Sequence, residues 1–159
     1  MIRTALTTAL CGLAALGASG AARAAPWPDA ETAVYSTLCW EHQSGDAAGH
    51  RLTVQGRGAN RTLRFEWSEG GLCGGEVTRF GYRPTSGRLR FTVSGCGSGP
   101  AGDTYTARII PGGVILSRVD FGDGRGAQPL NQLLPRIEDL SGTIPDCPTP
   151  APAPGPERR

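Results

Sequence analysis

The two histidines are the residues best suited to bind a metal, and they lie eight positions apart at His42 and His50. Two carboxylates, Glu41 and Asp46, lie near them in the sequence. A zinc site needs three or four ligands that converge on one point. These residues converge only if the polar segment that carries them folds back on itself. We therefore expect solvated histidines, with no bound metal or cofactor.

Carboxylates elsewhere in the chain suggest two further kinds of site. Glu66 with Glu69 or Glu76 would supply the acid and base of a glycosidase, but Glu66 is expected to point into solvent, where its pKa is not tuned. Residues 120–124, Asp-Phe-Gly-Asp-Gly, are similar to a calcium loop in composition. The alternating carboxylates and terminal glutamate of an EF-hand are missing, so we expect no bound calcium.

Nucleophilic catalysis has little support in the sequence. The chain has no lysine, which excludes a Schiff base and a P-loop lysine. It has no Gly-x-Ser-x-Gly elbow, because the serine in Gly95-Cys96-Gly97-Ser98-Gly99 is wrongly spaced. We expect a protein that is not an enzyme.

The cysteines indicate an oxidising compartment. Residues 1–24 have the features of a secretory signal: Arg3, an apolar run too short for a membrane span, and a small-x-small cleavage site. Cleavage removes Cys11 and leaves four cysteines, an even number typical of two disulfides. Four cysteines allow three connectivities, and the hairpin register described below favours Cys73–Cys96 with Cys39–Cys147.

The mature protein is expected to be periplasmic or secreted, without a membrane span. Residues 25–147 form one domain, and residues 148–159 alternate with proline, as in an extended, disordered tail. Loss of Arg3 and Arg23 with the signal leaves 14 arginines against 14 acidic residues. This neutral balance gives no reason to expect a nucleic-acid partner.

Apolar residues alternate with polar ones in residues 51–55, 62–68, 88–94 and 104–109. Period-two alternation predicts antiparallel strands with one face in solvent. Short turns at Ala59-Asn60, residues 83–86 and Pro111-Gly112-Gly113 join the strands as hairpins. The expected cross-strand partners are Val54 with Phe65, Leu52 with Trp67, Phe80 with Leu89, and Ile109 with Ile115.

The two ends of the domain are harder to assign. Residues 33–41 form either a strand, with Val34, Leu38 and Trp40 on one face, or a short helix, and we favour the strand. Leucines and an isoleucine between positions 130 and 140 have helical spacing, which Pro135 interrupts. We expect one helical turn there, followed by an irregular segment on the barrel mouth.

Together these patterns predict an all-β fold. A meander of twisted strands hides its edges by closing into a small up-and-down barrel, and a two-sheet sandwich is the alternative. Large inward residues, among them Phe65, Trp67 and Phe91, would fill such a barrel.

Candidate partner-binding residues are an arginine stripe and one tryptophan. Arg51, Arg64, Arg88 and Arg90 all fall on polar faces of their strands, where they would meet an anionic glycan, a lipid headgroup or an acidic protein. Trp27, between two prolines, either packs over the barrel or forms an exposed hook, and we favour packing. We expect an exported, non-enzymatic binding protein of the bacterial envelope, an inhibitor or accessory factor that acts through its surface. The alternative is a small-ligand binder that uses the barrel interior.

Overall fold

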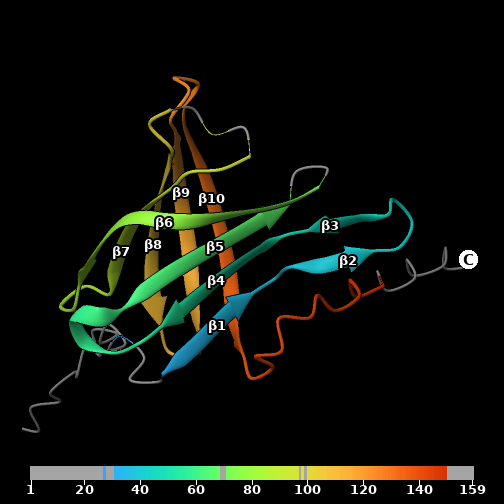
Figure 1. Cartoon of the computed structure of the whole chain (residues 1–159), viewed down its shortest axis with the longest axis horizontal. Coiled ribbons are helices and arrows are strands. Elements are labelled where there is room, and N and C mark those ends of the chain that lie inside the picture. The colour runs from blue at the N-terminus through green and yellow to red at the C-terminus, as the bar shows by residue number, and fades with distance from the viewer. Residues whose placement is uncertain (1–26, 28–30, 69–70, 97, 99, 150–159) are drawn as a thin grey trace, which may run out of the picture.

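Eight antiparallel strands close into a barrel in the order β1-β10-β9-β8-β7-β6-β5-β4, which confirms the barrel and not the sandwich (Figure 1). The computed structural model describes Trp27 and residues 31–68, 71–96, 98 and 100–149. The predicted signal of residues 1–24 lies outside the described residues, as do residues 150–159 of the predicted tail.

The strands from β4 to β10 follow one another around the barrel, as in the expected meander, and β1 closes it between β10 and β4. The barrel strands are β1 (Thr32–Ser36), β4 (His50–Gln55), β5 (Thr62–Ser68), β6 (Leu72–Arg83), β7 (Arg88–Val93), β8 (Asp103–Ile110), β9 (Gly113–Phe121) and β10 (Gly126–Ile137). A second, two-stranded sheet pairs β2 (Cys39–Glu41) with β3 (Asp46–Ala48) and projects from one side of the barrel (Figure 1).

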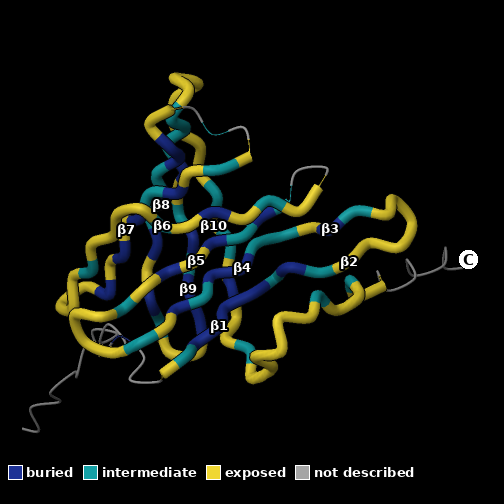
Figure 2. Tube along the Cα trace, viewed as in Figure 1, coloured by how far each residue is buried: buried dark blue, intermediate teal, exposed yellow. Residues whose placement is uncertain are grey.

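Side chains fill the inside of the barrel. Buried residues alternate with more exposed ones along β5, β7 and β8 (Figure 2), because successive side chains of a strand point to opposite faces. Phe65 lies at the centre, with its ring centroid 5.1 Å from that of Phe91 and 4.6 Å from that of Tyr105. Leu52, Leu89 and other aliphatic side chains surround this aromatic group and are inaccessible to solvent.

The expected hairpin registers are wrong by one or two residues. Phe65 pairs with Leu52 and not with Val54, Phe80 pairs with Phe91, and Ile109 pairs with Val114. The first error arises because the β4–β5 connection contains a 3₁₀ turn at Gly58–Asn60 and is therefore longer than a two-residue turn. Each true partner is still apolar, but Phe80, also expected inside the barrel, is 41% exposed, and Val114 takes the inward place expected for Ile115.

Both expected disulfides are present. Cys73 bonds to Cys96 with a Cα–Cα distance of 5.6 Å, and Cys39 bonds to Cys147 with a Cα–Cα distance of 4.7 Å. The first pairing was expected from a register that is wrong at the turn. A β-bulge between Val77 and Arg79 shifts the ladder back towards that register before it reaches the cysteines.

The two ends of the domain differ from expectation. Residues 33–41 are extended, as favoured, but they form two strands, and Ala33 and Tyr35 join the core cluster while Trp40 is exposed. The expected helical turn near Leu130 is absent from this described segment, which belongs to the 12-residue strand β10. Closure of the barrel requires this strand, and a bulge between Pro129 and Gln132 accommodates the irregular leucine spacing.

Candidate functional site

The predicted arginine stripe is divided between two parts of the barrel surface. The side chain of Arg51 is 7% exposed and donates hydrogen bonds to the backbone oxygens of Gly142, at 2.9 Å, and Thr143, at 3.2 Å. Its Nη1 lies 3.8 Å from Oε2 of Glu66, and the exposed Arg64 reaches the other oxygen of the same carboxylate at 3.5 Å. Arg51 and Arg64 therefore share one carboxylate, and Arg51 is withdrawn from solvent.

Arg88 and Arg90 belong to a larger group, which we call the arginine face. It consists of exposed arginines on the outer side of four adjacent strands: Arg79 and Arg83 on β6, Arg88 and Arg90 on β7, Arg108 on β8, and Arg118 on β9. Four of these six residues, Arg79, Arg83, Arg108 and Arg118, were not among the candidates predicted from the sequence. Their signal is the alternation of polar positions, but it takes the strand order and register to show that they are neighbours.

The arginine face places like charges directly opposite one another. Arg88 pairs with Arg83 on one side and with Arg108 on the other, so three guanidinium groups form a row across β6, β7 and β8. Two residues further along β7, Arg90 pairs with Gly81 and Thr106, and Thr106 pairs in turn with Arg118. Like charges directly opposite each other destabilise a sheet, and an anion placed between them removes that cost.

An open groove of about 580 Å³ runs over the arginine face and is lined by Arg83, Arg88, Arg90 and Arg118, among others. A Cβ added to Gly81 would meet nothing within 4 Å, so this residue leaves the floor of the groove open. Of the described residues that line the groove, Asp120 alone is acidic. Its carboxylate lies 2.6 Å from Nη2 of Arg118 and raises the pKa of that guanidinium.

Trp27 is packed against the barrel and is not an exposed hook. The residue is 6% exposed, and its ring lies edge-on to Tyr82 with 4.5 Å between centroids. The guanidinium carbon of Arg61 lies 5.3 Å from the centroid of the Trp27 ring. Burial raises the pKa of Tyr82, whose hydroxyl also bonds to the backbone of Trp27. These contacts give Trp27 a role in closing one end of the barrel.

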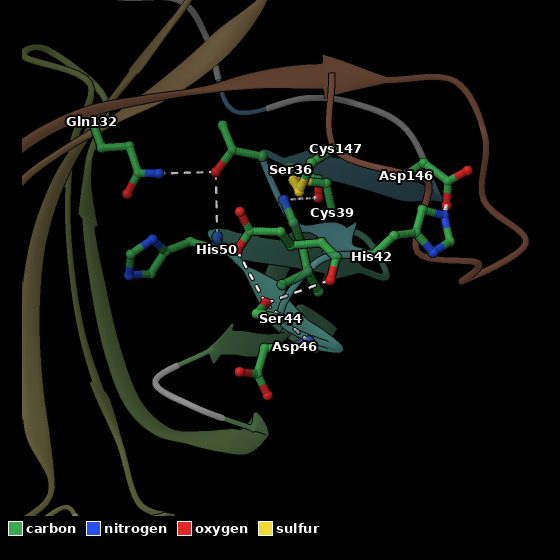
Figure 3. Close-up of a disulfide and its surroundings, with 12 residues drawn as sticks. Ser36, Cys39, His42, Ser44, Asp46, His50, Gln132, Asp146 and Cys147 are labelled. Carbon is green, nitrogen blue, oxygen red and sulfur yellow. Dashed lines mark hydrogen bonds and ion pairs between the residues drawn. A yellow bond between two sulfur atoms is a disulfide. The ribbon is translucent and has the colours of Figure 1, made fainter. Parts of the chain in front are cut away.

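The histidines and carboxylates considered for a metal site do not converge. His42 points to Asp146, with Nε2 2.8 Å from the carboxylate, whereas His50 and Asp46 point elsewhere (Figure 3). The ring of His50 lies over Phe65, with 5.6 Å between centroids. Within the described ranges, no group of three or more His, Cys, Asp and Glu side chains is placed to hold a metal ion.

The carboxylates of the calcium-like segment are held by neighbouring arginines. Asp123 forms an ion pair with Arg125, and the backbone amide of Arg125 lowers the pKa of the Asp123 carboxyl.

No helix among the described residues is long and apolar enough to cross a membrane.

The two disulfides are compatible with a periplasmic or extracellular location. Comparisons with protein-family models, with curated proteins and with solved structures find no match.

Proposed function

We propose that the protein is an exported, non-enzymatic binding protein of the bacterial envelope that engages an anionic partner through the outer surface of its barrel. The observation that carries the proposal is the arginine face, in which Arg88 lies between two other arginines with no carboxylate paired to it across either strand. The partner is an envelope component, and the protein acts on it as an inhibitor or as an accessory factor.

The contrast between the outside and the inside of the barrel supports surface binding. The interior is occupied by a continuous cluster of buried side chains centred on Phe65. The outer groove, by comparison, is open and charged. A ligand inside the barrel would have to displace aromatic side chains, whereas a ligand on the arginine face replaces water and relieves repulsion.

Export is supported by the signal-like sequence of residues 1–24 and by the disulfide that joins Cys39 to Cys147 across 108 residues. Disulfides persist in the periplasm and outside the cell and are rare in the cytosol.

Native mass spectrometry of the mature protein, purified from its own periplasm without reduction, tests the proposal against interior binding. We expect a mass that is four hydrogens lighter than the reduced chain, with no small molecule retained. A small ligand that remains bound after desolvation would favour the interior alternative and contradict surface binding. Free thiols would contradict export to an oxidising compartment.

A further inference from the structure

We propose that the arginine face binds a linear acidic polysaccharide, laid in the groove across β6, β7, β8 and β9. The inference rests on the proposed function and adds to it the chemical class of the partner. It is drawn from three features of the groove: the spacing of its charges, the hydroxyl groups between them, and its open glycine floor.

The charges are spaced for a chain with one anionic group per repeating unit. Directly opposed residues of antiparallel strands have Cα atoms about 4.5–5.5 Å apart, and this spacing applies to Arg83, Arg88 and Arg108. Arg88 and Arg90, two positions apart on one strand, are separated by roughly 6.7 Å. These intervals are comparable to the length of one sugar unit. Guanidinium groups also bind carboxylate and sulfate groups through paired hydrogen bonds.

Apart from Ile110 at the end of β8, the remaining outward positions of β7 and β8 carry hydroxyl groups. Thr92 faces Thr104, with 3.0 Å between the two side-chain oxygens, and Thr106 lines the groove next to Arg90. Threonine hydroxyls both donate and accept hydrogen bonds and so match the hydroxyl groups of a sugar. Peripheral binding to a bilayer relies instead on an apolar face, whereas Ile110, half-buried at the end of β8, is the one apolar side chain among the outward residues of these two strands.

The floor of the groove favours a thin chain over a folded acidic protein. Gly81 lies opposite Arg90 and projects no side chain into the groove, so a strand of sugar units can lie close to the backbone. A folded protein partner would need a central desolvated apolar patch, and the groove lining is dominated by arginine.

Isothermal titration calorimetry at low salt tests the inference with three probes: polygalacturonate, polyglutamate of matched charge, and vesicles that contain phosphatidylglycerol. We expect saturable binding to polygalacturonate that is tighter than binding to the other two. Arg88→Gln combined with Arg90→Gln is expected to weaken it by about tenfold or more, because two charge-assisted contacts are lost. Gly81→Glu, which places a carboxylate on the groove floor, is expected to weaken it while every arginine remains.

Matched controls separate the groove from overall charge. Arg64→Gln combined with Arg125→Gln also removes two positive charges, but from arginines that already have acidic partners. Gly81→Ala adds a methyl group without charge. Both should bind as the wild type does. Thermal unfolding of each variant checks that the fold is intact. If Gly81→Glu fails to fold, Arg88→Gln combined with Arg90→Gln still tests the groove.

Each contrary outcome has a distinct meaning. Tighter binding to vesicles or to polyglutamate would overturn the polysaccharide and leave the proposed function standing. Equal loss of affinity in the control pair would overturn the groove as the site. If the folded protein binds none of the three probes, both the inference and the proposed anionic partner are rejected.

Discussion

Two regions of the same barrel surface carry arginines on alternate strand positions, but they have different fates. On β4 and β5, Glu66 lies between Arg51 and Arg64, and the segment that contains Gly142 and Thr143 covers Arg51. On β6 to β9, Arg88 faces two other arginines and remains exposed.

The difference teaches that an arginine on the polar face of a strand has a structural or a binding role according to its neighbours. Arg51 satisfies two backbone oxygens and one carboxylate, so it fastens the C-terminal segment to the barrel. That segment is also held by Cys39–Cys147 and by the backbone hydrogen bonds between Trp40 and Pro145 and between Cys147 and Trp40. The arginine face has no such cover among the described residues.

Removal of the disulfide that fastens the cover should have the largest effect on stability. The double change Cys39→Ser and Cys147→Ser opens a loop of 108 residues, and loop closure of this length contributes roughly 5 kcal/mol. We expect the free energy of unfolding, measured with urea, to fall by about that amount. Removal of Cys73–Cys96, which closes a loop of 23 residues, should cost less. The reverse order would contradict the role assigned to the C-terminal segment.

Replacement of Arg51 should have the next largest effect. Arg51→Met leaves Glu66, whose side chain is 13% exposed, without its buried partner, and also removes two hydrogen bonds to the backbone oxygens of Gly142 and Thr143. We expect a loss of about 3 kcal/mol in the free energy of unfolding.

The matched control for Arg51 is Arg64→Met, which removes an exposed contact to the same carboxylate and should cost at most about 0.5 kcal/mol. Adding Glu66→Gln to Arg51→Met should restore part of the loss. Equal losses of stability in Arg51→Met and Arg64→Met would contradict the structural role assigned to Arg51.

The contrast between the two regions also explains what the sequence could predict. Alternation along β5, β7 and β8 predicted which side chains face inward, because the period of a strand is two regardless of its neighbours. The barrel followed, since consecutive hairpins must hide their edges. These inferences needed only local pattern.

The register of the strands and the burial of Arg51 depend on contacts that cannot be inferred from the local sequence pattern. The loop at Gly58–Asn60 is longer than the pattern implied, and a bulge near Val77 then shifts the β6–β7 register. Arg51 was grouped with Arg88 because both lie on polar faces. The covering residues Gly142 and Thr143 are 91 and 92 positions further along the chain, too far for any local signal. The pairing of Arg88 with Arg108 likewise depends on strand order.

Trp27 offers an intermediate case, because it was a candidate for binding and is found packed. Trp27→Ala should lower the free energy of unfolding by about 2 kcal/mol, less than for a central tryptophan because it lies at one end of the barrel. The Trp27 ring contacts Tyr82 and Arg61, and its removal would leave these two residues exposed. Affinity for an anionic probe should not change. A stable variant with lost affinity would return Trp27 to the binding surface.

The substitution with the smallest expected effect on stability tests most directly whether Arg88 differs from Arg51 in its role. Arg88→Gln removes the central charge of the row formed with Arg83 and Arg108. Relief of like-charge repulsion should raise the free energy of unfolding by about 0.5 kcal/mol at low salt. The gain should shrink as salt rises, because screening already weakens the repulsion.

A loss of stability in Arg88→Gln would mean that Arg88, like Arg51, is held by partners within the fold. Thermal unfolding of Arg88→Gln and Arg51→Met at two salt concentrations distinguishes these roles. If the arginine face is built for an anion, the substitution that stabilises the free protein is also one that weakens its binding. A residue that lowers stability and raises affinity is expected where a surface is arranged for a partner and not for the fold.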